Sequence, residues 1–196
     1  MSARASAGAA GLILALLAAG TVTPAAADPA LAQLMQLLAA RQHRHATFTE
    51  VQQLAMLEGP LSSSGELFYD APDRLEKRTL KPQPESLVLD HAVLTARRGH
   101  HVQVLELAAY PQVVPFVESI RATLAGDQAA LERYFTLDFS GDVAQWTLQL
   151  KPKDPAVARS VQSITLSGER EALQRVEIRQ GDGDHSLMTI GPEISP

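Results

Sequence analysis

The sequence predicts an α+β protein that is mainly β, built on an open, strongly curved antiparallel β-barrel or half-barrel of about eleven strands. Short segments of alternating apolar and polar residues, separated by turns rich in Gly, Pro and Asp, recur from residue 46 to residue 190. One amphipathic helical pattern precedes them, and another lies between two runs of strands, at 113–134. We therefore expect an N-terminal helix and a two-helix insert that covers an open end of the sheet as a lid.

Residues 1–27 are predicted to be a cleaved signal peptide, and residues 28–196 a single domain. Arg4 supplies positive charge, 12–19 form an apolar stretch, and Ala25-Ala26-Ala27 is a small-residue cleavage site. The apolar stretch is about 12 residues long, whereas a transmembrane helix needs about 20. We expect cleavage before Asp28 and a soluble periplasmic protein; an uncleaved anchor helix is the alternative.

The composition excludes several classes of protein. The sequence has no cysteine, so it has no lipid-attachment cysteine after the signal peptide and no disulfide. Its net charge is −5, which becomes −6 when Arg4 is removed with the signal peptide. An acidic protein has no electrostatic affinity for nucleic acid, so we expect no nucleic-acid partner.

The first helix is predicted over 29–42. Asp28 is a suitable N-cap and Pro29 suits the first helical position. The apolar residues that follow recur at helical spacing: Leu31, Leu34, Met35 and Leu38. This single apolar stripe indicates that the helix packs on a face of the sheet.

The first strand is predicted over 46–57. Its apolar side changes from Phe48 to Val51, and we expect a β-bulge near Val51 as the cause. The strand pattern is clearest at 144–151, where Trp146 and alternate residues are apolar. The other strands are predicted at about 65–69, 74–81, 86–90, 92–97, 102–107, 135–139, 161–166, 173–179 and 186–190.

The lid is predicted from a change of period after Pro111. Six apolar residues fall on one helical face: Val113, Val114, Phe116, Val117, Ile120 and Leu124. Gly126 is the expected residue after the helix end, and Asp127 caps a second helix at 128–134.

Candidate catalytic and metal-binding residues are few. The sequence has no G-x-S-x-G motif, no P-loop and no cysteine nucleophile. Its six histidines lack metal-ligand spacing, and Asp182-Gly183-Asp184 with Glu193 matches a calcium loop poorly, because Leu187 stands where glycine is needed. We expect a protein that is not an enzyme and that holds no metal or cofactor.

Several short segments resemble the LolA family of periplasmic outer-membrane lipoprotein carriers in their order and spacing. They are His45–Glu50, Gly65-x-Leu67, Ala71-Pro72-Asp73, Thr79-x-x-Pro82 and Glu85–Asp90. The resemblance extends over about residues 28–90. It implies an open β-barrel with a helical lid and an apolar cavity that holds lipid-modified cargo.

The resemblance also implies which residues bind the ligand. It places Phe48, Leu67 and Leu75 on barrel strands and Phe116, Val117, Ile120 and Leu124 on the lid. We add Trp146, from the clearest strand, to the predicted lining. Such a lining would hold an acyl chain by burial alone, at about 0.8 kcal/mol per CH₂.

The sequence differs from the family at one informative position. Ala71 stands where the family commonly has an arginine that helps to hold the lid closed. This difference favours a LolA-related paralogue, a carrier of another amphiphile such as a glycolipid. The alternatives are a true lipoprotein chaperone and an interaction protein that binds a membrane protein. We expect a monomer with lipidic or lipoprotein cargo, an inner-membrane donor, an outer-membrane acceptor and transient contact with membrane surfaces.

Overall fold

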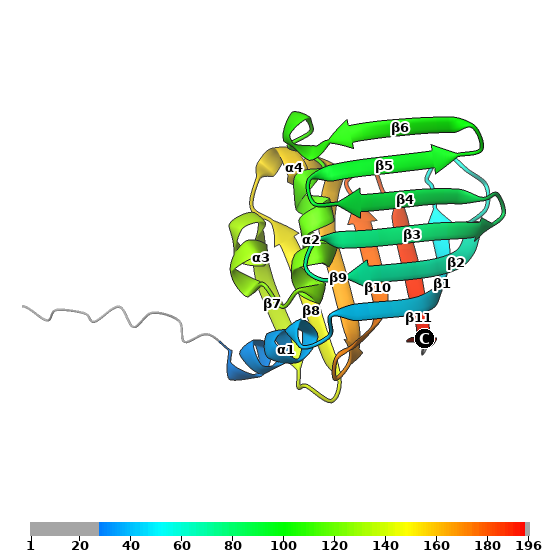
Figure 1. Cartoon of the computed structure of the whole chain (residues 1–196). Coiled ribbons are helices and arrows are strands. Elements are labelled where there is room, and N and C mark those ends of the chain that lie inside the picture. The colour runs from blue at the N-terminus through cyan, green and yellow to red at the C-terminus, as the bar shows by residue number, and fades with distance from the viewer. Residues whose placement is uncertain (1–27, 195–196) are drawn as a thin grey trace, which may run out of the picture.

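The computed structural model describes residues 28–194, so the predicted signal peptide lies outside the described residues. This part of the chain forms eleven antiparallel strands in one sheet and four α-helices (Figure 1). The strand order is β6-β5-β4-β3-β2-β1-β11-β10-β9-β8-β7, and the edge strands β6 and β7 do not pair with each other. The predicted fold class, an open and curved antiparallel sheet of about eleven strands with an N-terminal helix and a two-helix insert, is confirmed.

The helices are α1 (Pro29–Ala39), α2 (Val114–Leu124), α3 (Gln128–Tyr134) and α4 (Pro155–Ser160), with a short 3₁₀ helix, η1 (Leu107–Ala109). The strands are β1 (His43–Gln53), β2 (Leu61–Asp70), β3 (Arg74–Lys81), β4 (Glu85–Asp90), β5 (Val93–Arg98), β6 (His101–Glu106), β7 (Phe135–Gly141), β8 (Trp146–Pro152), β9 (Val161–Glu169), β10 (Ala172–Gln180) and β11 (His185–Glu193).

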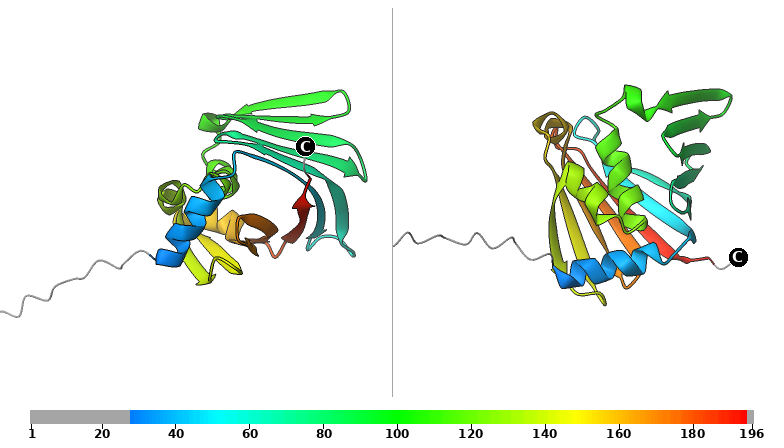
Figure 2. Two further views of the ribbon diagram at one scale, coloured as in Figure 1. Left: turned by 60° about the horizontal axis from the view of Figure 1, so that its bottom comes forward. Right: turned by 60° about the vertical axis from the view of Figure 1, so that its left-hand side comes forward.

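The sheet has two halves that meet where β1 pairs with β11. On β1, Phe48 lies opposite Gly65 of β2 and Ile190 of β11. The N-terminal half is the meander β1–β6, and the C-terminal half contains β7–β11. Figure 2 shows the sheet curving around helices α1, α2 and α3. We call the side of the sheet that carries Phe48 and faces these helices the inner face.

The bulge predicted near Val51 is wrong. Alternation continues through β1, because Glu50 occupies the inner position with 6% exposure and Val51 points outward. The pairing of β1 with β11 is irregular elsewhere, between Ala46 and Phe48. Glu50 tolerates burial because Lys77 and Ser63 bind its carboxylate, and this compensation is not visible in the local sequence pattern.

The helices differ from the predictions in two respects. Helix α1 ends at Ala39, three residues before the predicted Gln42. Helix α4, from Pro155 to Ser160, was not predicted at all. It begins with the same signature as α1, because Asp154 caps the Ala156 N–H at 2.7 Å and Pro155 takes the first helical position.

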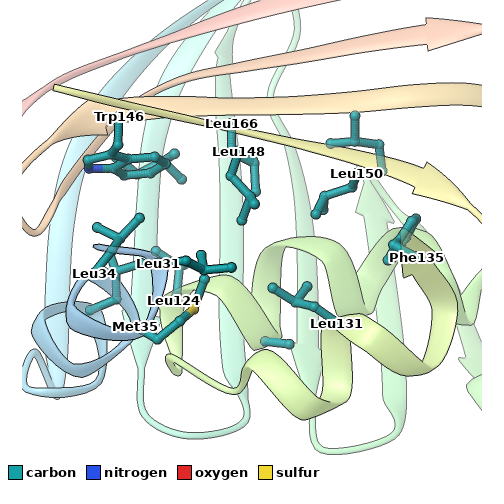
Figure 3. Packing of buried hydrophobic residues seen from close by; sticks show 14 of the residues in the cluster. Leu31, Leu34, Met35, Leu124, Leu131, Phe135, Trp146, Leu148, Leu150 and Leu166 are labelled. Carbon is teal, nitrogen blue, oxygen red and sulfur yellow. The ribbon is translucent and has the colours of Figure 1, made fainter. Parts of the chain in front are cut away.

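The main hydrophobic core lies between α1, α2, α3 and the inner face of β8–β10 (Figure 3). Leu148, Leu150 and Leu166 are fully buried there. Gly126, between α2 and α3, lets these helices approach α1 closely: its φ is +67°, and a Cβ at this position would lie 2.1 Å from the Met35 carbonyl oxygen. No helix within residues 28–194 is long and apolar enough to cross a membrane.

Candidate functional site: the inner face beneath helix α2

Helix α2 lies on the inner face between the two halves of the sheet (Figures 1 and 2). Near its N-terminal end, Val117 packs with Leu89 of β4 and Leu107 of η1. Further along the helix, Ala122 and Leu124 belong to the main core. The same helix therefore contacts both halves through apolar side chains, as expected of a lid in its closed position.

The inner face of the N-terminal half presents an apolar surface next to α2. The strand registers place Leu75, Leu89 and Leu94 side by side in one row across β3, β4 and β5. The adjacent row contains Leu67 of β2, Lys77 of β3 and Leu87 of β4. Apart from Leu89, which is buried, these side chains are partly exposed. Helix α2 thus covers only part of this surface.

A small pocket opens between the N-terminal end of α2 and helix α4. Its volume is about 90 Å³, and its lining includes Pro115, Phe116, Phe135 and Val157. This volume is small beside the roughly 300–1,000 Å³ of typical ligand pockets. The pocket is apolar, and a long acyl chain needs more room than the present position of α2 leaves.

The eight predicted site residues lie in two kinds of surroundings. Four are buried: Phe48, Val117, Leu124 and Trp146. The other four are Leu67 and Leu75 on the partly exposed inner surface, Ile120 against the main core and Phe116 at the pocket. Leu75 contacts both hydrophobic clusters, so the structure brings it together with residues of α2.

Trp146 lies apart from the pocket. Its indole Nε1–H donates to the Arg170 carbonyl oxygen at 2.9 Å. Figure 3 shows Trp146 beside Leu31 and Leu34 of α1, at the opposite end of the cluster from Phe135, which lines the pocket. Trp146 is thus held between α1 and the β9–β10 turn.

Arg121 of α2 joins the helix to the rim of the sheet, and sequence reasoning missed it. Its Nη1 donates to Oδ1 of Asp73, in the β2–β3 turn, at 2.7 Å, and its Nη2 donates to Glu118 at 2.6 Å. The hydrogen bond to Glu118 is the main reason why the pKa of Arg121 is raised. The signal in the sequence was the Glu118-x-x-Arg121 pair, whose spacing places both charged side chains on the same side of the helix.

An ion pair with a buried carboxylate lies on the inner face beside the leucine rows. Lys77 of β3 donates to Glu50 of β1, and Ser63 of β2, between them, donates to the same carboxylate oxygen at 3.3 Å. The Lys77 ammonium also lies 5.0 Å from the centre of the Phe48 ring. The contacts with Lys77 and Ser63 compensate the negative charge of Glu50 within a largely apolar surface.

Arg44 fixes the end of α1 against the C-terminal half. Its guanidinium donates to the carbonyl oxygens of Leu38 and Glu171, and to a carboxylate oxygen of Glu193 at 3.1 Å. Burial lowers the pKa of Arg44, and burial raises the pKa of Tyr69, which lies opposite it on β2. This network is structural, because each acceptor belongs to a different segment of the chain.

Among residues 28–194, no group of three or more His, Asp or Glu side chains is arranged to hold a metal ion. What the inner face offers is apolar area, covered by a helix that is joined to the sheet rim by an ion pair.

An open, curved antiparallel sheet with a helix on its inner face defines the fold class of this chain (Figure 2). Residues 21–191 match the family described as outer membrane lipoprotein carrier protein LolA-like. The chain belongs to this family, and the resemblance seen in its sequence is confirmed.

Solved structures with similar folds share little sequence with this chain. A LolA superfamily protein from Nitrosomonas europaea has 10% identity and a TM-score of 0.46, over 87% of this chain and 94% of that one. The lipoprotein LppX from Mycobacterium tuberculosis has 10% identity and a TM-score of 0.44, over 87% and 98%. The MucA/MucB complex of Pseudomonas aeruginosa has 14% identity and a TM-score of 0.44, over 84% and 58%. No curated protein matches the sequence.

Proposed function

We propose that this protein is a soluble periplasmic carrier that binds a lipidic or other amphiphilic molecule beneath α2 and shuttles it from the inner to the outer membrane. The observation that carries the proposal is the position of α2 on a partly exposed leucine surface, beside an apolar pocket. The Arg121–Asp73 pair links this helix to the β2–β3 turn. The proposed role is binding and transport, without catalysis.

The ligand would exchange places with the lid. When α2 moves away, Val117 leaves Leu89, and an acyl chain covers the uncovered leucines in its place. A chain of about fourteen carbons contributes on the order of 10 kcal/mol by burial. The cost of exposing α2 and of ordering the chain opposes this gain. The proposal requires that the gain from a long chain exceeds this cost, so that the helix is displaced without a polar anchor.

Two alternatives each have an observation in their favour. The family description favours a true lipoprotein chaperone, whose cargo is an acylated protein received from an inner-membrane donor and delivered to an outer-membrane acceptor. The tightly packed main core favours an interaction protein that binds a membrane protein and no lipid.

Native mass spectrometry of the protein, purified from its native periplasm without detergent, tests the proposal. We expect a monomer with a bound amphiphile, which organic extraction releases for identification. A lipid or glycolipid supports the proposed carrier, and an acylated peptide supports the lipoprotein chaperone. An empty protein that also fails to bind added acyl-chain probes contradicts both and favours the interaction protein.

A further inference from the structure

Strand β6 forms one of the two edges of the sheet, and within residues 28–194 no other element pairs with its outer side (Figure 1). A free edge strand presents unpaired backbone N–H and C=O groups to which another strand can bond. Natural edges usually carry lysine, proline or a bulge that prevents such pairing. Strand β6 carries none of these: its sequence is His-Val-Gln-Val-Leu-Glu, and its register with β5 is regular. The edge is therefore open to a further strand.

The direction of the free backbone groups follows from the pairing of β6 with β5. In an antiparallel pair, residues that bond to the neighbouring strand alternate with residues that do not. The Leu107 N–H, directly after β6, donates to the Ala92 carbonyl oxygen at 2.9 Å, so alternate residues of β6 also bond toward β5. The N–H and C=O groups of Val102, Val104 and Glu106 therefore point away from the sheet.

The outer face of β6 also exposes apolar side chains. Val102 and Val104 are 53% and 59% exposed. They lie on the opposite face from Leu105, which stands beside Leu94 of the inner-face row. The other edge, β7, carries an exposed aspartate at its middle position, Asp138, and a charge there disfavours pairing with a second copy. Thus β6, and not β7, combines free backbone groups with an exposed apolar surface.

The sequence of β6 is self-complementary when two copies run antiparallel. A two-fold axis at Gln103 places Val102 of one copy opposite Val104 of the other, twice, so that four valines meet on the outer face. The same register brings His100 of the β5–β6 turn opposite Glu106 of the second copy. An imidazole N–H can donate to a carboxylate whether the ring is neutral or charged. The residues that pair in this register are those whose backbone groups point outward.

The register opposes no like charges. Besides Glu106, the titratable residue of β6 is His101, which falls opposite Leu105 of the second copy. The two arginines nearest the edge, Arg97 and Arg98, lie on β5, one strand further from the axis, and Arg98 is paired with Glu85 of β4. The edge therefore suits a second copy of itself in charge as well as in shape.

We propose that two copies of this chain pair through β6 in antiparallel orientation and form a two-fold symmetric dimer with one continuous sheet. The axis is perpendicular to the sheet, so the inner faces of both copies lie on the same side. A six-residue edge gives weak association. The protein is then a monomer at the low micromolar concentrations of native mass spectrometry and a dimer when concentrated. The inference stands without the carrier proposal, because it depends on the edge and not on the surface beneath α2.

Sedimentation equilibrium of the protein purified from its periplasm, from low micromolar to submillimolar concentration, tests the association. We expect the average mass to rise toward that of a dimer. Val104→Pro removes an N–H that points outward, so the monomer should fold while association weakens at least about tenfold. Val104→Lys should act similarly, because it places a charge among the valines. Val51→Lys, at an exposed valine on β1, is the matched control and should associate as the unaltered protein does.

Disulfide cross-linking tests the register. The chain has no cysteine, so Gln103→Cys places one thiol of each copy on the axis. Opposed residues that are not hydrogen-bonded have Cα atoms about 4.5 Å apart, which a disulfide can span. In His101→Cys, the two positions lie about 14 Å apart along the strands, at about 3.4 Å per residue, which is too far. With copper phenanthroline as oxidant, we expect a covalent dimer from Gln103→Cys and none from His101→Cys.

The proposal is overturned if the concentrated protein stays a monomer, if Val51→Lys weakens association as much as Val104→Pro, or if both cysteine variants cross-link equally. Circular dichroism checks that each variant is folded, and if both Val104 variants unfold, the cross-linking of Gln103→Cys decides. Failure here leaves the carrier proposal intact, since bound cargo is detected separately by mass spectrometry. An empty protein that dimerises through β6 would contradict the carrier proposal alone.

Discussion

Arg121 of helix α2 and Asp73 of the β2–β3 turn form an ion pair between lid and sheet, with 2.7 Å between Nη1 and Oδ1. The family resemblance implies an arginine at position 71 for holding the lid closed, and Ala71 occupies that position. Here the cation lies on the helix and the acceptor lies in the turn. The Arg121–Asp73 pair therefore attaches the lid to the sheet without an arginine at position 71.

Asp73→Asn should loosen α2. The substitution keeps the size of the side chain but removes the charge, while Arg121 retains Glu118. We expect a loss of about 1 kcal/mol in the free energy of unfolding, because both side chains are partly exposed to solvent. Hydrogen exchange in α2 should become faster. Arg98→Ala, at the exposed Arg98–Glu85 pair, is the control and should change little. Unchanged exchange in the Asp73 variant would show that apolar contacts alone hold the lid.

Ile120→Asp should abolish ligand retention while the sheet stays folded. Ile120 is partly buried against the main core, so a carboxylate there disfavours closure of α2 over an apolar ligand. Native mass spectrometry measures retention and circular dichroism measures folding. Val104→Asp makes a similar change at an exposed strand position and should retain the ligand. If Ile120→Asp unfolds the protein, Ile120→Ala should still reduce retention; full retention by a folded variant contradicts the lid mechanism.

Lys77→Met should destabilise the protein by about 3 kcal/mol. It leaves the Glu50 carboxylate, 6% exposed, without its cation, and an unpaired buried charge is costly. Urea unfolding measures the loss. Adding Glu50→Met in the same chain should recover most of it, because the pair is then replaced by apolar side chains of similar size. A double variant as unstable as the single one would mean that Lys77 stabilises the fold through its contact with Phe48 instead.

Gly126→Ala should destabilise the protein more than Gly99→Ala. Both glycines have positive φ, +67° and +56°, so alanine is strained at each, by about 1 kcal/mol. Only at position 126 does the added Cβ meet the Met35 carbonyl oxygen, at 2.1 Å, whereas nothing lies within 4 Å of it at position 99. We expect the difference in unfolding free energy to exceed about 1 kcal/mol. Equal losses would mean that α1 shifts freely.

Glu171→Gln should remove a pH-dependent contribution to stability. The hydrogen bond from Arg41 is the main cause that lowers the pKa of Glu171 from its ordinary value of 4.5. Because the pKa is lower in the folded state, the carboxylate stabilises the fold at pH values above its unfolded-state pKa. This stabilisation is lost as the pH falls through the folded-state pKa. The pair is partly exposed, so we expect less than about 1 kcal/mol at neutral pH and no difference well below pH 4.5. Thermal unfolding of both proteins across this range checks the sign, and a difference that grows in acid would contradict it.

The local sequence determined most of the fold. Alternation with a period of two predicts strands, because successive side chains on a strand point to opposite faces. The capping residues Asp28 and Asp127 and the stripe on α2 predicted three of the helices for equally local reasons. Helix α4 was missed because six residues are too few to show a helical period, although Asp154-Pro155 carried the start signal.

The tertiary structure decided the features that depend on contacts between residues far apart in the sequence. Glu50 tolerates its inner-face position because Lys77, two strands away, pairs with its carboxylate. Arg121 joins the lid to the sheet through Asp73, which lies 48 positions away in the sequence. The size of the pocket and the burial of Trp146 depend on how three helices fill the curve of the sheet. These features arise from contacts between distant segments, and only folding brings those segments together.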